Sequence, residues 1–242
     1  MSHFDDAKLL VRHAKNRISE IKKEYDDSLE KMNVEPSLLV DIKNLMENLR
    51  SALDFAAHGL FDAHGHSSKK NLNIYFPYAP LAQSLDEFRR KNRIEICIPG
   101  LSSSRPDIVM KLESYQHFTS SENKWLPLFM DLNNENKHQK LTPQVRAEKR
   151  QLDITSGGTG ITLQDGASIS LGNGASIKMG GMTILGGQTI TTESPAITTG
   201  LGSQTITKWI SFYFSTNNEP VVPFLEKAIL KVEGIIDELS TI

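Results

Sequence analysis

Apolar residues near the start of the chain recur at helical spacing in two consecutive segments. Residues 5–32 and 37–63 each carry an apolar side chain every three or four positions, which predicts two long amphipathic helices. A short break separates them, and Pro36 suits the first turn of the second helix. Two long helices with so short a link should pack antiparallel. The predicted inward-facing positions are Leu10, Ala14, Ile18, Ile21, Tyr25 and Leu29, followed by Leu39, Ile42, Leu45, Met46, Leu49, Leu53, Ala56, Ala57 and Leu60.

Shorter elements are expected in the part of the chain that follows. Capping boxes, apolar spacing and prolines mark their ends. The predicted elements are an extended piece over 73–77, a helix over 85–92 after the capping box Ser84–Glu87, a helix that begins near Pro106, and a helix around Trp125 after the capping box Thr119–Glu122.

The pattern changes to strand-like alternation between residues 151 and 215. Twelve of the sixteen glycines lie between Gly157 and Gly202, and charged residues almost vanish there. These features predict several short antiparallel strands joined by glycine turns. The motif Gly-Ala-Ser-Ile occurs twice, eight residues apart, which fits one turn of a solenoid or, because two copies are few, a hairpin meander. The turn signals are Asp165-Gly166 and Asn173-Gly174 for hairpins and Gly157-Gly158 and Gly180-Gly181 for further turns, and the last strand should span 205–214.

A final apolar stripe follows the strands. It predicts a closing helix with Leu225, Ile229, Val232, Ile236 and Leu239 on one side. Helices on both sides of the strands predict an α+β fold, an antiparallel helical bundle with a glycine-rich antiparallel β insertion before the C-terminal helix. The predicted domains are a helical body over 1–150, a β-rich segment over 151–215, and a C-terminal helix over 216–242 that packs back on the body.

Composition excludes few classes of protein. The chain has 242 residues, 38% of them hydrophobic, and a formal net charge of -2, so no overall basic field favours nucleic acid. Its one cysteine, Cys97, lies in an apolar run, which predicts a buried thiol. No apolar run approaches the roughly 18 residues that a membrane span needs. The first residues do not fit a signal peptide either, so we expect a cytoplasmic protein without a membrane partner.

Several short motifs carry a resemblance to known proteins. The run "NLRSALD" over 48–54 is followed, in order, by Phe76-Pro77, Phe88, Pro99-Gly100-Leu101, Tyr115 and Asn136-Lys137-His138. This order resembles a group of uncharacterised bacterial proteins over residues 40–142, and the resemblance implies architecture more than activity. The helices are also loosely similar to HEPN bundles, some of which are metal-independent ribonucleases. Their motif places an arginine and a histidine closer together on one helix than Arg50 and His58 stand here.

Three polar residues of the second helix form a stripe. Arg50, Asp54 and His58 follow each other at intervals of four, which places them on one helix face. In a catalytic site Asp54 would orient His58 as acid or base, Arg50 would bind a phosphate or carboxylate, and Lys137 and His138 would approach from another helix. The candidate catalytic residues are therefore Arg50, Asp54, His58 and His138, and the candidate ligand-binding residues are Arg50 and Lys137. The alternative is a salt-bridge network that fixes helix packing.

No metal or cofactor is predicted. His58, Asp62, His64 and His66 are metal-capable, but their spacing fits no established site. The chain has no phosphate-binding glycine loop, nucleophile elbow or zinc-binding HExxH motif.

Three functions stay open at this point. The leading hypothesis is an interaction or assembly protein, because strands with so few charges present edges that can pair with another copy or a protein partner. The second is a HEPN-like ribonuclease acting on RNA in a toxin or phage-defence setting. The third is a small-ligand or nucleotide binder that uses the Arg50 stripe without chemistry.

Overall fold

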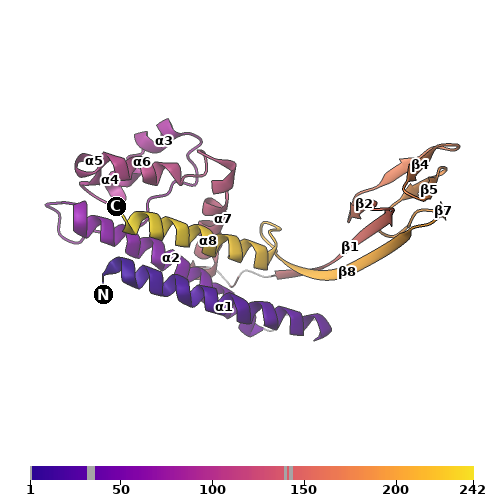
Figure 1. Ribbon diagram of the computed structural model, residues 1–242. Coiled ribbons are helices and arrows are strands. Elements are labelled where there is room, and N and C mark those ends of the chain that lie inside the picture. The colour runs from indigo at the N-terminus through magenta and orange to yellow at the C-terminus, as the bar shows by residue number, and fades with distance from the viewer. Residues whose placement is uncertain (1, 32–35, 139–140, 142–143) are drawn as a thin grey trace. The chain divides into compact units, whose positions relative to one another are not determined.

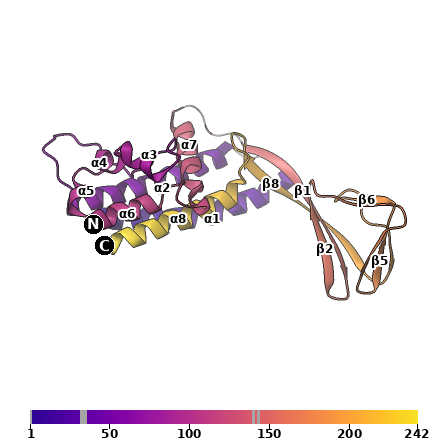
Figure 2. The same ribbon diagram turned by 90° about the horizontal axis from the view of Figure 1, so that it is seen from above.

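Three long helices form the framework of the helical part. The computed structural model describes residues 2–31, 36–138, 141 and 144–242. Helices α1 (His3–Lys31), α2 (Pro36–His64) and α8 (Val221–Ser240) lie side by side in two perpendicular views (Figures 1 and 2). The pairs His3–Asp62 and Arg17–Asp41 make α2 antiparallel to α1. These contacts confirm the predicted antiparallel packing.

The last helix packs antiparallel to the first. Lys8 pairs with Asp237, Lys15 with Glu233 and Lys22 with Glu226, so the partner number falls as the α1 number rises. Helix α8 therefore returns to the helical body, as the sequence predicts. Together with the strands described below, this confirms the predicted α+β fold.

The buried faces of α1 and α8 share a coiled-coil spacing. In α1 the buried residues alternate at intervals of four and three, which keeps a seam facing a partner helix. Helix α8 contains the same series, widened by the buried Phe224, Ile229 and Ile236. Leu10 is only half-buried because Ala7 and Val11 occupy the seam instead, and Leu38 likewise replaces Leu39 in α2. The side chain of Leu29 lies outside the described residues. The two series are Ala7, Val11, Ala14, Ile18, Ile21 and Tyr25 in α1, and Val221, Leu225, Ala228, Val232, Ile235 and Leu239 in α8.

Short helices fill the chain between α2 and the strands. They are α3 (Leu85–Arg90), α4 (Arg93–Cys97), α5 (Leu101–Ser104), α6 (Pro106–Ser114), the 3-10 helix η1 (Ser121–Asn123) and α7 (Trp125–His138). The predicted helix over 85–92 was too long, because Asn92 adopts a left-handed φ of 48° that ends the helical path. The cap before η1 is Ser120 rather than Thr119, since the Ser120 side chain accepts the backbone N–H of Glu122. Residues 73–77, all within the described chain, form no strand.

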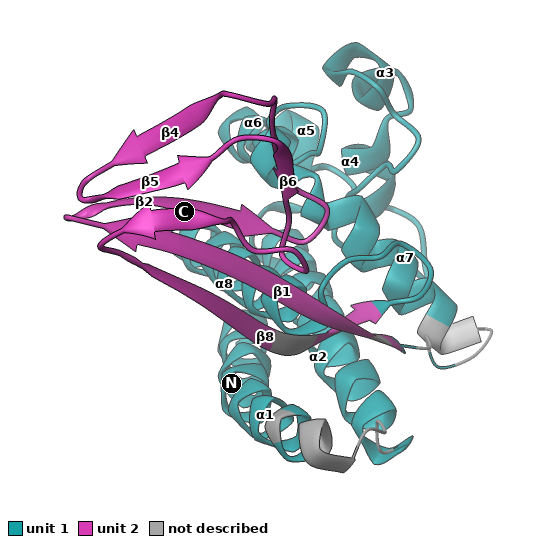
Figure 3. Ribbon diagram, turned by 90° about the vertical axis from the view of Figure 1, so that its right-hand side faces the viewer, with its two compact units in different colours: residues 1–144, 214–242 teal, residues 145–213 magenta. Residues whose placement is uncertain are grey.

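The chain divides into two units (Figure 3). The helical unit comprises residues 1–144 and 214–242, and the β unit comprises residues 145–213. The helical unit thus contains both ends of the chain, and the β unit is an insertion between α7 and α8 in sequence. The sequence pattern placed the boundaries after residues 150 and 215, but β1 already begins at Gln144.

Three small sheets make up the β unit. Strand β1 (Gln144–Ser156) lies between β2 (Thr159–Gln164) and β8 (Ser203–Phe214). Strand β3 (Ile169–Leu171) pairs with β6 (Gln188–Ile190), and β5 (Met182–Leu185) lies between β4 (Ser176–Met179) and β7 (Thr198–Gly200). The β1–β2, β3–β6, β4–β5 and β5–β7 pairs are antiparallel, as predicted.

Glycine pairs make the tight turns of this unit. Gly157-Gly158 closes the hairpin of β1 and β2, and Gly180-Gly181 closes that of β4 and β5. The prediction of hairpins at Asp165-Gly166 and Asn173-Gly174 is wrong. These turns join β2 to β3 and β3 to β4, and neither pair of strands is hydrogen-bonded, because β2 pairs with β1, β3 with β6 and β4 with β5. The Asp165 carboxylate accepts the backbone N–H of Arg150 at 2.9 Å instead of closing a local hairpin.

One small apolar cluster holds the three sheets together. It contains residues from β1, β2, β5 and β6 and from the loop before β7. Further apolar side chains at its margin, such as Ile161 and Ile177, are only partly buried. The members of the cluster are Leu152, Ile154, Leu163, Met182, Ile184, Ile190 and Ala196.

No helix in the described ranges of the chain combines the length and the apolar character that crossing a bilayer requires.

The two helical glycines of the bundle provide a test of how α1 packs against α2. A Cβ added at Gly234 in α8 would meet no atom within 4 Å, so Gly234→Ala should raise the free energy of unfolding by about 0.5–1 kcal/mol. In α2, a Cβ at Gly59 would lie 2.7 Å from the Phe4 ring. Gly59→Ala should therefore raise the free energy of unfolding less than Gly234→Ala does, or lower it. Urea denaturation of both variants measures the difference; equal gains would contradict the packing.

Candidate functional site

Arg50 and Asp54 fasten an irregular segment to α2. The Nε of Arg50 lies 3.2 Å from Oδ2 of Asp54, and Oδ1 of Asp54 accepts the backbone N–H of Phe76 at 2.9 Å. The Arg50 guanidinium also lies 5.1 Å from the centre of the Tyr78 ring and contacts the sulfur of Met130. The two charged groups are thus engaged by the protein itself, in the arrangement of a packing network.

His58 is separated from that network. Among the hydrogen bonds of the described residues, none joins Asp54 to His58. The His58 ring instead lies 5.3 Å from the ring of His3, whose Nε2 pairs with Asp62 at 3.1 Å. The stripe therefore splits into two parts that contact different segments.

The predicted second half of the site belongs to the end of α7. Lys137 and His138 are the last two residues of α7, and their side chains lie outside the described residues. Their convergence on Arg50, and with it the ribonuclease hypothesis, stays a prediction.

The histidines near the end of α2 have local partners. Nη1 of Arg105 lies 3.1 Å from Nε2 of His64. The backbone N–H of His66 donates to the carbonyl oxygen of Pro99 at 3.0 Å. The His66 ring packs closely over Gly100, where any Cβ would collide with it. Within the described chain, no three His, Cys, Asp or Glu residues stand close enough to share a metal ion.

Cys97 is buried, as predicted. Burial raises the pKa of its thiol, and nearby Asp54 acts in the same direction while the cations Arg93 and Arg50 oppose it. A thiol that stays protonated is a poor nucleophile. Cys97 therefore contributes to the packing of the core.

The β4–β5–β7 sheet has an apolar row on its outward face. Leu185 is opposite Ser176 in β4, and its N–H donates to the carbonyl of Ile197 just before β7 at 2.9 Å. Side chains alternate across a sheet, so these three residues point away from the core that contains Ile184. Leu185 and Ile197 are 37% and 63% exposed. The sheet thus presents two adjacent apolar side chains outward.

Few charges accompany this row. The next row on the same face consists of Lys178, Thr183 and Thr199, with one charge among three residues. The outward face is consequently almost neutral.

Glutamine side chains form hydrogen bonds with the backbone groups of the residues just before β7. Oε1 of Gln204 accepts the N–H of Ala196 at 2.9 Å, and its Nε2 donates to the Ala196 carbonyl at 2.8 Å. Oε1 of Gln188 accepts the N–H of Ile197 at 2.8 Å. These amides take the place of a ladder partner, so a second chain would meet the face of this sheet more readily than add a strand here.

Neither Leu185 nor Ile197 stands out in the sequence as a candidate contact residue. The adjacent apolar pair Ile184-Leu185 breaks the alternation of β5 and was the available signal. An outward-facing leucine of this kind is visible only when the register is known.

The fold and these surfaces define an α+β protein with a helical body and an inserted, charge-poor β unit. Comparison with known protein families, curated proteins and solved structures found no match. The similarity to the NLRSALD-containing group and to HEPN bundles therefore stays a prediction. What can be inferred about function rests on the residues of this chain.

Replacing Asp54 tests the packing role of the stripe. Asp54→Ala leaves the Phe76 N–H and the partly buried Arg50 without their acceptor, so the free energy of unfolding should fall by about 2–4 kcal/mol. The matched control is Glu47→Ala, which breaks the more exposed Lys43–Glu47 pair on the same helix and should cost less than about 0.5 kcal/mol. Urea denaturation compares the two; similar small losses would refute the packing role.

Proposed function

We propose that the chain is an assembly protein whose β unit joins one copy to another. The contact surface is the outward face of the β4–β5–β7 sheet, centred on Leu185 and Ile197. The helical unit is the stable body that carries this surface. The observation that supports the proposal most is the adjacent exposed apolar pair on a nearly neutral sheet.

A second copy suits this face because the face is self-compatible. Two identical faces related by a twofold axis bring the same residues together, so any charge on one meets the same charge on the other. Here the two rows contain one charged residue, Lys178, and the remaining side chains are apolar or hydroxyl-bearing. Self-association thus removes Leu185 and Ile197 from water with little repulsion.

The stripe at Arg50 supports the other two functions less well. Arg50 and Asp54 already engage Phe76, Tyr78 and Met130, which leaves little capacity for a phosphate or a base. A ribonuclease or a nucleotide binder at this place would have to displace those contacts. We therefore do not favour either function.

Charge introduced into the apolar row tests the assembly proposal. Wild-type protein should form a species of at least twice the 27.0 kDa chain mass, with a concentration-dependent equilibrium in sedimentation velocity. Ile197→Lys and Leu185→Lys place a cation at a centre that should be dehydrated, and we expect each to weaken association at least tenfold, about 1.4 kcal/mol.

Leu230→Lys is the matched control. Leu230 is 64% exposed on α8 in the helical unit, so the same kind of substitution there should leave association unchanged. A wild-type chain that stays monomeric at all concentrations, or a Leu230→Lys variant that dissociates as readily as Ile197→Lys, would overturn the proposal. Loss of association in the β variants alone would support it.

A further inference from the structure

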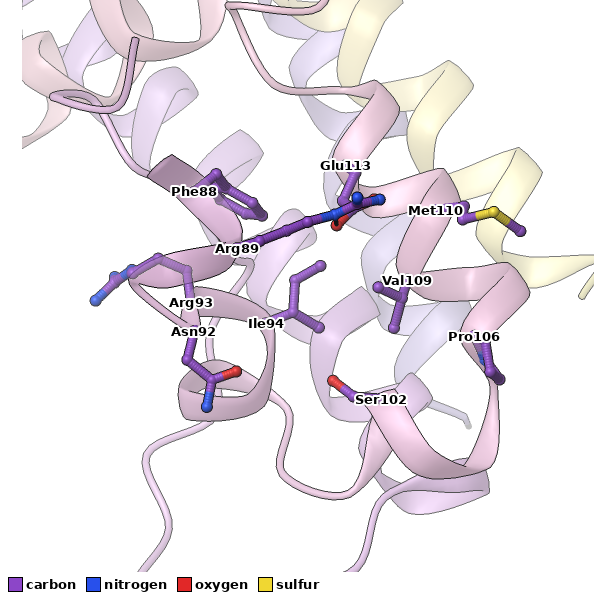
Figure 4. A pocket seen from close by; sticks show the side chains of 10 residues that line it. All are labelled: Phe88, Arg89, Asn92, Arg93, Ile94, Ser102, Pro106, Val109, Met110 and Glu113. Carbon is purple, nitrogen blue, oxygen red and sulfur yellow. Dashed lines mark hydrogen bonds and ion pairs between the residues drawn. The ribbon is translucent and has the colours of Figure 1, made fainter. Parts of the chain in front are cut away.

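A cavity of about 350 Å³ opens among the short helices of the helical unit. Figure 4 shows its walls, which come from α3, α4, α5 and α6 and from the turns between them. Small-molecule sites in proteins begin at about this size. The cavity lies on elements that the assembly proposal does not use.

An ion pair between a half-exposed arginine and a buried glutamate forms the polar wall. Arg89 extends across the cavity to Glu113, with Nε 2.7 Å from Oε1 and Nη2 2.7 Å from Oε2. Glu113 is 5% exposed, whereas the Arg89 side chain is 54% exposed. A guanidinium whose Nε and Nη2 both donate to one buried carboxylate has a fixed orientation. The Nη1 edge of the guanidinium is therefore preset, at low entropic cost, for another acceptor.

Beside the ion pair, the unused hydrogen-bonding capacity of the cavity is a donor, because a guanidinium cannot accept a hydrogen bond, whereas an amide and a hydroxyl can do both. Nη1 of Arg89, the side-chain amide of Asn92 and the hydroxyl of Ser102 have no hydrogen-bond partner among the described residues. Both oxygens of Glu113, in contrast, are already bonded to Arg89. The site consequently favours a ligand that accepts hydrogen bonds.

The rest of the wall is apolar. Ile94 and Val109 approach each other below the ion pair in Figure 4, and Met110 and Pro106 lie on the outer side. Ile94 is 5% exposed, and the cavity-facing Phe88 is 1% exposed. These side chains provide a surface for a hydrocarbon body of a few carbons.

We propose that this cavity binds a small organic acid with an apolar body. Its carboxylate accepts a hydrogen bond from Nη1 of Arg89, and its hydrocarbon part lies between Ile94 and Val109 and extends toward Ser102. A single negative charge matches the site better than a phosphate dianion, because the Glu113 carboxylate lies beside the same guanidinium and repels additional charge. This inference is independent of the assembly proposal.

Methyl NMR of the full chain tests the site directly. Hexanoate, as the probe, should shift the Ile94 methyl resonance saturably, and neutral hexanamide of the same length should bind at least tenfold more weakly. Arg89→Lys keeps a cation opposite Glu113 but loses the fork, so the dissociation constant for hexanoate should rise at least tenfold. Equal binding of the two probes, or no shift of Ile94, would overturn the proposal.

Two blocking variants locate the binding. Val109→Phe fills the apolar slot from α6, and Ser102→Leu blocks the opposite side from an exposed position that tolerates substitution. Each should abolish the hexanoate shift while the helical circular dichroism stays unchanged. If Val109→Phe fails to fold, Ser102→Leu alone decides. Unaltered hexanoate affinity in a folded blocking variant would place the binding elsewhere and refute the assignment.

Discussion

The packing of α8 against α1 and α2 is the constraint on which the helical unit depends. Leu225, Ala228 and Val232 of α8 are buried, although long stretches of chain separate them from α1 and α2. The entropic cost of closing a loop grows only with the logarithm of its length. A β unit can therefore be inserted between α7 and α8 with little loss, provided that the α8 seam is strong enough to bring the end of the chain back.

Polar groups in the helical unit hold irregular chain in place. Asp54 accepts the N–H of Phe76, which has no helix or strand to satisfy it, and Arg50 lies over Tyr78. A backbone group buried without a partner would be costly, so a charged acceptor on a rigid helix is an effective anchor. Residues that resemble a catalytic stripe in sequence can thus be explained by the segment that they fix.

The β unit and the cavity of the helical unit are suited to binding different kinds of partner. The β unit has a small apolar core with half-buried residues at its margin, as expected for a domain whose surface is large relative to its volume. Its exposed Leu185 and Ile197 offer non-directional contact to a large partner. The Arg89–Glu113 wall instead offers directed hydrogen bonds to a small molecule.

Local patterns in the sequence determined the long helices, the change to strands and the glycine-pair turns, because periodicity and backbone freedom depend on near neighbours. They also predicted the buried face of α8, whereas in α1 Leu10 was placed in the seam that Ala7 and Val11 occupy. Only the tertiary structure decided that Asp165-Gly166 closes no hairpin, that Leu185 faces outward and that Asp54 binds the backbone at Phe76. Strand pairing and side-chain partners join residues that are distant along the chain, and no short-range spacing specifies which of the possible partners will meet.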